Sequence, residues 1–329
     1  MTKEQNKIFS DIAWKWINKN LKQNKKIAII VNKKWYSSGI ICNECWYIPK
    51  CENCDVSIAY HINLQWNFFW LCHICKRHYN PIWQCPNCQS TQINTYWYWI
   101  EKIHQTIKKN FWADPFIIES KNTNSYKKAS LAKQKMQNKN IIIWTSILGK
   151  TKNIKFDLVI FLNADLGLNI PDFNSSYRNF LFLYESLQIL DSKNFLVQSF
   201  ATQNHSIRYA CEMNIEKFKD IELQYRKDFE YPPFKKVCKI LYKNEIEQKL
   251  FEKVDTLYKE LLFLKEKYDL SDIQIYSTPP MIYKMFWKYR YNIILKWDNL
   301  KNFMDIAYSK LKIQQKWFKI DREPENIVN

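Results

Sequence analysis

Glycine is nearly absent from this chain, which has 3 glycines and 14 tryptophans in 329 residues. Glycine ordinarily supplies about 7% of residues, because turns and helix ends need positive φ angles that other residues adopt only at a steric cost. Two explanations stay open: a protein truly rich in tryptophan, or UGA codons that the organism reads as glycine and a standard translation reads as tryptophan. We favour the second, because the tryptophans stand at positions that call for turn geometry. It predicts glycine in the native protein at Trp14, Trp16, Trp35, Trp46, Trp97, Trp99 and Trp144.

Long apolar runs are also missing. No stretch approaches the roughly 18 uninterrupted apolar residues that indicate a membrane-spanning helix, and the start, Met1-Thr2-Lys3, has no apolar signal segment. We therefore expect a cytoplasmic protein with no membrane partner. Hydrophobic residues still make up 47% of the chain, which is enough for ordinary cores, and the length allows two domains.

Acidic residues are in deficit, with 32 Asp+Glu against 50 Lys+Arg and a formal net charge of +18. A charge of this size predicts a polyanionic partner, and nucleic acid is the commonest one inside a cell. A lysine-rich composition imposed by an AT-biased genome would give the same excess. That alternative stays open, because the charge is spread along the chain.

Cysteines are concentrated in one segment as four Cys-x-x-Cys pairs. Two thiolates separated by two residues can turn around one Zn²⁺, and two such pairs complete a tetrahedral site that leaves no position for a reacting water. The pattern predicts two structural zinc ions per chain, in which adjacent pairs share a metal or the pairing crosses, first with fourth and second with third. A disulfide scaffold is the alternative, but it is typical of small secreted chains. The pairs are Cys42/Cys45, Cys51/Cys54, Cys72/Cys75 and Cys85/Cys88.

Three histidines and two further cysteines could bind metal by residue type but are not assigned to the zinc sites. Eight thiolates fill two tetrahedra, so His61, His73 and His78 are interpreted as surface or loop residues. Cys211 and Cys238 are isolated in the sequence and are predicted to be buried thiols.

The hydrophobic pattern predicts a doubly wound α/β lobe into which the cysteine segment is inserted. The run Ile27–Val31 is typical of a strand buried on both faces of a parallel sheet. A helix over 4–24 precedes it, with Ile8, Ile12, Ile17 and Leu21 on its apolar side. The other predicted elements are strand 26–32, helix 100–110, strand 115–119, helix 125–138, strands 140–144 and 157–163, helix 177–190, strand 194–200 and helix 205–229.

A second domain is predicted after Tyr231-Pro232-Pro233-Phe234, because the residue before a proline is pushed out of the helical region. Its elements follow a β-α-β-β-α-β order, which is typical of a ferredoxin-like sandwich. They are strand 236–243, helix 245–268, strands 272–277 and 289–296, helix 299–312 and strand 317–321.

Short motifs are distributed along almost the whole chain. They are Asn32-Lys33-Lys34-Trp35-Tyr36, the four cysteine pairs, Trp97-Tyr98-Trp99-Ile100-Glu101, Trp144-Thr145, Asn163-Ala164-Asp165 with Gly167, Pro171-Asp172-Phe173, Tyr225-Arg226-Lys227, Tyr231-Pro232-Pro233-Phe234 and Lys288-Tyr289-Arg290-Tyr291. In this order they resemble motifs in the C-terminal half of the PriA family of replication restart helicases. Seven tryptophans fall where the family carries glycine or accommodates it: Trp35, Trp46, Trp97, Trp99, Trp144, Trp287 and Trp297.

The resemblance implies a fold and a zinc pairing. The fold is a second RecA-like helicase lobe (1–41 and 91–230) with a two-zinc insertion (42–90), followed by a ferredoxin-like α+β domain (231–329). The implied pairing is the crossed one, with Cys42, Cys45, Cys85 and Cys88 on one zinc and Cys51, Cys54, Cys72 and Cys75 on the other. Forked or single-stranded DNA is the implied partner, and primosome proteins, a single-stranded DNA-binding protein or a separate helicase lobe are further ones.

The chain also departs from the family. We expect the first motor lobe, which carries the ATP phosphate loop and the Asp-Glu-x-His box, to be missing. The arginine-rich motif VI is absent as well, because Tyr184–Asp191 reads YESLQILD. A motor needs a phosphate cradle and charge-stabilising arginines. We therefore expect a truncated or degenerate DNA-binding protein of replication restart, without catalytic residues. The alternatives are an ATP-dependent 3′-5′ DNA helicase subunit completed by a separately encoded first lobe, and a zinc-ribbon scaffold that binds only proteins.

Two segments imitate nucleotide sites. With glycine in place of Trp144, residues 144–151 satisfy the phosphate-loop pattern, with Lys150 as the nucleotide contact. A phosphate loop must open a helix, whereas only Lys152–Phe156 separate this stretch from the next strand, so a plain connecting loop is favoured. Asp165 imitates a magnesium-binding aspartate at a strand end but lacks its partner.

Candidate DNA contacts are Lys288 and Arg290, and in the cysteine segment Lys76 and Arg77. In Lys288-Tyr289-Arg290-Tyr291, cations alternate with aromatic rings, so cations can meet phosphates while rings stack on bases. The alternative is a solvated sheet face whose tyrosines pack inward.

Overall fold

The protein is described by a computed structural model, in which the chain divides into two compact units. Unit 1 consists of Met1–Ser37, Tyr96–Ile170 and Ser175–Lys219, and unit 2 of Ser38–Thr95, Pro171–Asn174 and Asp220–Asn329. The structure describes residues 8–31, 40–42, 44, 49, 51–52, 58–62, 68–71, 77–80, 82–95, 99–118, 130–131, 134–136, 138–144, 155–165, 168, 172–280, 282–311, 318–325 and 327.

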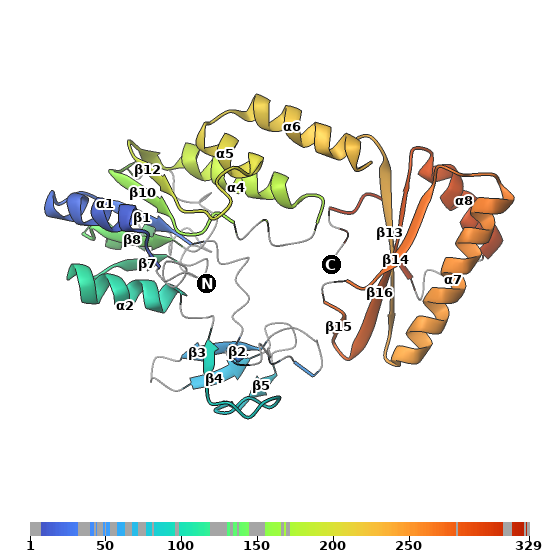
Figure 1. Cartoon of the computed structure of the whole chain (residues 1–329), viewed down its shortest axis with the longest axis horizontal. Coiled ribbons are helices and arrows are strands. Elements are labelled where there is room, and N and C mark those ends of the chain that lie inside the picture. Colours follow the sequence, from blue (N-terminus) through green and yellow to red (C-terminus); the bar gives the residue numbers. More distant parts are fainter. Residues whose placement is uncertain are drawn as a thin grey trace. The chain divides into compact units, whose positions relative to one another are not determined.

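Unit 1 is built on a five-stranded sheet in the order β12-β10-β1-β8-β7 (Figure 1). Every pair in it is parallel, and central Ile29 lies between Ile143 and Ile160. The continuous apolar runs explain this, because strands of a parallel sheet are covered on both faces. The predicted parallel sheet is confirmed. Its strands are β1 (Ile27–Ile30), β7 (Phe116–Ile118), β8 (Ile141–Trp144), β10 (Leu158–Phe161) and β12 (Phe195–Val197).

Each face of this sheet carries its own hydrophobic core. Alternate residues such as Ile27 and Ile29 pack with α1 (Asp11–Lys22) and α2 (Trp99–Phe111). Their neighbours Ala28 and Ile30 pack with α4 (Ser175–Ile189) and α5 (His205–Cys211). Because successive side chains of a strand point to opposite faces of the sheet, each strand contributes residues to both cores.

The first helix is shorter than predicted. It begins at Asp11, because the Ser10 hydroxyl accepts a hydrogen bond from the Ala13 N–H and caps the helix. Ile17 is buried as predicted, but Ile12 is 58% exposed, so its placement on the apolar side was wrong. The predicted turn geometry at Trp14 and Trp16 was also wrong, because both lie in α1. At Trp99 and Trp144 it was wrong too, because these residues lie in α2 and β8.

The long helix predicted over 205–229 is two helices. α5 ends at Cys211 and α6 runs over Ile215–Asp228. Met213 between them has φ 52°, a left-handed conformation that no α-helix continues, and the Asn214 side chain accepts a hydrogen bond from the Lys217 N–H. The end before Tyr231 was predicted correctly.

Three further segments complete unit 1 within the described residues. β9 (Lys155–Phe156) and β11 (Asp191–Ser192) form a two-stranded parallel pair that the sequence did not predict. The helix predicted over 125–138 lies largely outside the described residues, of which 130–131 and 134–136 are helical.

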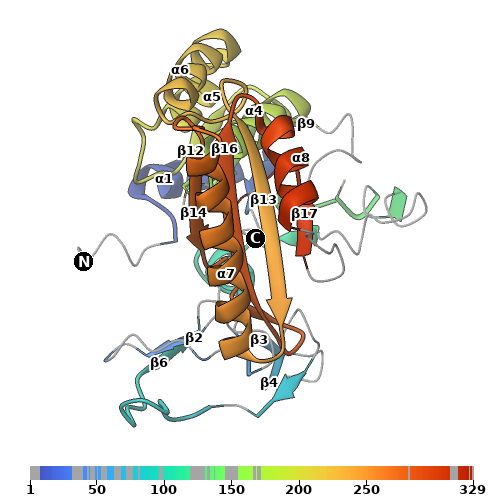
Figure 2. The same cartoon turned by 90° about the vertical axis from the view of Figure 1, so that its right-hand side faces the viewer.

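The C-terminal part of unit 2 is an antiparallel sheet in the order β14-β16-β13-β17, with β15 paired to β16. Helices α7 and α8 cover one face of it (Figures 1 and 2). Leu250, Leu257 and Leu261 of α7 and Phe303 of α8 fill the core between helices and sheet. The elements are β13 (Lys236–Asn244), α7 (Glu247–Lys267), β14 (Gln274–Thr278), β15 (Lys284–Met285), β16 (Lys288–Trp297), α8 (Leu300–Leu311) and β17 (Phe318–Asp321).

The cysteine segment contributes two small antiparallel sheets to unit 2. One pairs β2 (Ile40–Cys42) with β6 (Ile93–Thr95), and the other has the order β3-β4-β5. The strands of the second are β3 (Ala59–Ile62), β4 (Phe68–Leu71) and β5 (His78–Tyr79).

Among the helices described, none combines the length and the apolar character that crossing a membrane requires.

Candidate metal centre and basic sheet face

Three cysteine thiols from distant parts of the cysteine segment meet at one point. The sulfur atoms of Cys42, Cys85 and Cys88 all lie within 4.8 Å of one another, and Cys42 Sγ is 3.5 Å from Cys88 Sγ. Cys42 and Cys85 are buried, whereas Cys88 is exposed. Thiolates around one zinc, each about 2.3 Å from the metal, lie about 3.8 Å apart, so the three sulfurs fit three corners of such a site.

Local backbone geometry explains why these thiols converge. Cys42 is the last residue of β2 and stands opposite Ile93 of β6. The turn after Cys85 is closed by hydrogen bonds from the Gln89 N–H to the Cys85 carbonyl and from the Cys85 N–H to the Ser90 carbonyl, both 2.8 Å. Gln89 has φ 60°, which reverses the chain so that both thiols of the pair can face one metal.

The three thiols belong to the first and fourth cysteine pairs, which is the combination that the crossed pairing predicts. Sharing between adjacent pairs would instead bring Cys42 together with Cys51. Cys45, the fourth predicted ligand, lies outside the described residues.

Of the second predicted ligand set, only Cys51 lies within the described residues, while Cys54, Cys72 and Cys75 lie outside them. Cys51 is buried, and the Tyr79 hydroxyl donates a hydrogen bond of 3.0 Å to its sulfur. Burial, together with this hydrogen bond, raises the pKa of Tyr79. Hydrogen bonds of this kind orient metal-bound thiolates. The sequence analysis did not identify Tyr79 as a partner of a cysteine. Its position four residues after Cys75 was the available signal.

The two remaining cysteines differ from each other. Cys238 is buried in the core under α7, and burial raises the pKa of its thiol to about 12. Cys211 is exposed at the end of α5, so its predicted burial was wrong. Cys211 is the last residue of this helix, two positions before the left-handed Met213.

Asp165 has a structural explanation. Its carboxylate accepts hydrogen bonds from the Ser199 hydroxyl at 2.6 Å, the Phe200 N–H at 2.8 Å and the Ala201 N–H at 3.1 Å. The side chain therefore fixes the loop that follows β12. Lys150, the other imitation of a nucleotide site, lies outside the described residues.

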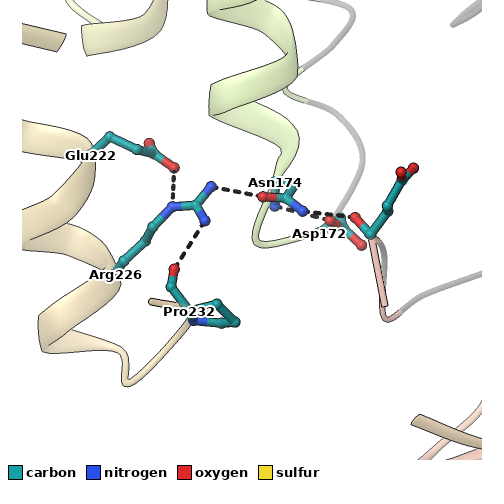
Figure 3. A network of polar contacts seen from close by, with 6 residues as sticks. Asp172, Asn174, Glu222, Arg226 and Pro232 are labelled. Carbon is teal, nitrogen blue, oxygen red and sulfur yellow. Dashed lines mark hydrogen bonds and ion pairs between the residues drawn. The ribbon is translucent and has the colours of Figure 1, made fainter. Parts of the chain in front are cut away.

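Three of the sequence motifs come together in one polar network (Figure 3). Arg226 of α6 donates to Glu222 at 2.8 Å, to the Pro232 carbonyl at 3.0 Å and to Asn174 at 2.7 Å. Next to Asn174, Phe173 stacks on Tyr231 with ring centroids 5.0 Å apart. The motifs at 171–173, 225–227 and 231–234 thus form one structural joint within unit 2.

The predicted DNA contacts have different surroundings. The Lys288 side chain is 50% exposed and lies 3.7 Å from the Glu245 carboxylate. Arg77 is exposed and pairs with Glu52 at 2.9 Å. Arg290 is buried, and its guanidinium donates to the Ile282 carbonyl. Lys76 lies outside the described residues.

Fold and site together define an α/β protein with a parallel-sheet unit, an antiparallel sheet covered by helices and a cysteine cluster able to hold a metal. No family model matches the chain. It is similar to the replication restart protein PriA of Borreliella burgdorferi, with 28% identity over 340 residues that cover 100% of this chain and 50% of that protein.

The replication restart proteins PriA of Thermotoga maritima and Bacillus subtilis are 25% and 24% identical to the chain. The matches cover 90% and 96% of this chain and 40% of each relative. The chain thus spans half or less of the length of these curated relatives. The resemblance to PriA that the motifs indicate is confirmed.

Proposed function

We propose that the chain is a zinc-containing, PriA-like DNA-binding protein of replication restart and primosome assembly. The observation that carries the proposal is the similarity to PriA along 90 to 100% of the chain. The net charge of +18 supports a polyanionic partner. Forked or single-stranded DNA is the proposed ligand.

The proposal includes two structural zinc ions. The convergence of Cys42, Cys85 and Cys88 supports a first site completed by Cys45. The buried Cys51 with its tyrosine hydrogen bond supports a second, completed by Cys54, Cys72 and Cys75. Zinc would supply folding energy to a segment whose strands are too short to form a core of their own.

The proposed folds are a RecA-like helicase lobe for unit 1 and a ferredoxin-like domain for the C-terminal part of unit 2. The five parallel strands with helices packed on both faces support the first. The order β14-β16-β13-β17, with both helices on one face, supports the second.

Salt dependence of DNA affinity tests the function. We expect a forked oligonucleotide to bind the full chain with an affinity that falls steeply with salt, because each neutralised phosphate contributes about 0.7 to 0.9 to the slope of log K against log salt. Lys288→Ala should lower the slope by about that amount. Lys259→Ala is the matched control, because Lys259 is also an exposed lysine paired with a carboxylate, Asp255. A salt-independent affinity would favour the protein-only scaffold instead.

A second candidate is a subunit of an ATP-dependent 3′-5′ helicase, completed by a separate first motor lobe. The parallel sheet of unit 1 favours it, because motors place nucleotide between two such lobes. ATP hydrolysis that starts only when a second polypeptide is added would establish this candidate.

A further inference from the structure

The face of the C-terminal sheet that points away from α7 and α8 carries a group of cations. On β13, Cys238, Ile240 and Tyr242 pack into the core with the helices. Side chains alternate along a strand, so Lys239 and Lys243 lie on the opposite face.

Strand register brings these cations together across β13, β16 and β17. Lys243 stands directly opposite Arg290 of β16, and Lys319 of β17 stands opposite Leu241. Two like charges directly opposite each other on one face of a sheet repel. A group of opposite charge beside the pair would offset this repulsion.

Arg290 is the most deeply placed of these side chains. It is 6% exposed, and one terminal N–H donates to the Ile282 carbonyl at 3.2 Å. Its Nε is fully buried and, among the described residues, has no hydrogen-bond partner. Buried donors are almost always paired, so an unpaired arginine N–H indicates an acceptor that belongs beside it.

The surrounding charges do not supply that acceptor. Burial lowers the pKa of Arg290. Burial also lowers the pKa of Lys243, and the charges that act on it are Arg290, Lys319 and Lys288, all cations. The carboxylates that act on neighbouring Lys239 are Asp321 and Asp172. Positive charge therefore exceeds negative charge on this part of the sheet.

We propose that Arg290, Lys243 and Lys319 form a binding site for a phosphate oxyanion. A guanidinium presents a fork of donors that matches the oxygens of a phosphate, and the lysines add charge. Lys243 is half-buried and Lys319 is exposed, so the anion reaches Arg290 from their side.

The site does not depend on the proposed function, because a chain that bound no DNA would still bind inorganic phosphate there. A free phosphate and a phosphodiester of a DNA strand share the required chemistry. A separate arm of the experiment distinguishes these two sources.

The test follows the side-chain Nε–H signals of the six arginines by NMR on the full chain. Inorganic phosphate is titrated into the protein, and a parallel titration with chloride at the same ionic strength is the control. We expect a saturable downfield shift of the Arg290 signal, assigned from its loss in Arg290→Lys. Lys243→Met should weaken phosphate binding at least tenfold. Lys236→Met, at an exposed position on the same strand, should leave it unchanged.

An Arg290 signal that does not respond to phosphate, or an equal response in Lys243→Met and Lys236→Met, would overturn the proposal. The backbone spectrum of each variant shows that it is folded. Oligothymidylate without terminal phosphates then identifies the source. If it shifts Arg290 and displaces phosphate, the ligand is a phosphodiester; if phosphate alone acts, the ligand is a small anion. DNA affinity measured on the same samples tests the proposed function separately.

Discussion

At the residue scale, two tryptophans in the described part of the chain have the backbone conformation that favours glycine. Trp112 follows the last residue of α2 with φ 53°, and Trp287 lies between β15 and β16 with φ 66°. Their side chains are 92% and 57% exposed. A left-handed residue after a helix is usually glycine. The recoding hypothesis named Trp287 from the resemblance but missed Trp112, whose signal was its place after a helical pattern.

The native residue at these positions is directly measurable. We expect glycine at 112 and 287, as well as at the seven positions predicted first, because UGA recoding would act wherever the codon occurs. Peptide mass spectrometry of the protein from its own organism checks this. Peptides that carry an indole mass at Trp112 and Trp287 would contradict the hypothesis.

The same positions also make a stability prediction that needs no native source. Trp112→Gly should raise the free energy of unfolding by about 1 kcal/mol, because a left-handed backbone costs a residue with Cβ about 1 to 2 kcal/mol. Trp112→Ala removes the indole but keeps Cβ, so it should give no such gain. Urea unfolding gives the free energies of unfolding of the two variants. Equal free energies would show that the gain comes from removal of the indole and not from the backbone conformation.

Arg226 holds the joint between three motifs through hydrogen bonds to Glu222, Pro232 and Asn174. Arg226→Met should lower the free energy of unfolding by about 2 to 4 kcal/mol, because it removes the ion pair with the buried Glu222 carboxylate together with the hydrogen bonds to Pro232 and Asn174. Arg208→Met is the control, since Arg208 also pairs with a glutamate four positions away, Glu212, in the opposite chain order and at the surface, where ion pairs contribute little. Denaturant unfolding that ranks the two variants equally would contradict this account.

At the scale of elements, the proposed zinc sites predict that the fold of the cysteine segment requires metal. We expect two zinc ions per chain by metal analysis, one in Cys88→Ser and two in Cys211→Ser, because only the first cysteine is in a proposed ligand set. Chelation should unfold the segment around β2 to β6 while the parallel sheet of unit 1 stays folded, since its core contains no cysteine. Two zinc ions in Cys88→Ser would contradict the proposed ligand set.

Buried strands were the most predictable elements. β1, β8 and β10 lie within one to two residues of their predicted ends, because continuous apolar runs have few alternative placements. Two-residue strands such as β9 and β15 carry no periodicity and were missed. The break between α5 and α6 was missed because its signal is a single capping residue, Asn214, inside a helical pattern.

The candidate site was predictable in part. The spacing of the cysteines predicted which thiols bind metal, and three of them, from the first and fourth pairs, lie together in the structure. The full pairing, which the resemblance implies, stays a prediction. The joint around Arg226 was not predictable, because it connects Asn174 with a residue 52 positions away. The burial of Arg290 was not predictable either, because an alternating pattern of cations and rings does not reveal which face of a sheet is covered.

At the scale of the whole molecule, the sequence predicts no ATP hydrolysis by this chain alone, with or without DNA. In the sequence, residues 144–151 are interpreted as a connecting loop that opens no helix, and the stretch 184–191, where motif VI is expected, contains no arginine. A phosphate-release assay checks this. Turnover above background that disappears in Lys150→Ala would reinstate residues 144–151 as a nucleotide site.

The interleaving of the two units along the chain has a consequence for fragments of this protein. A cut between Lys219 and Asp220 leaves Pro171–Asn174 on one fragment, while its partners Arg226 and Tyr231 remain on the other. The hydrogen bond between Arg226 and Asn174 and the stacking of Phe173 on Tyr231 therefore connect the two pieces. A nicked chain should accordingly remain associated, and separately expressed halves should reassemble by fragment complementation.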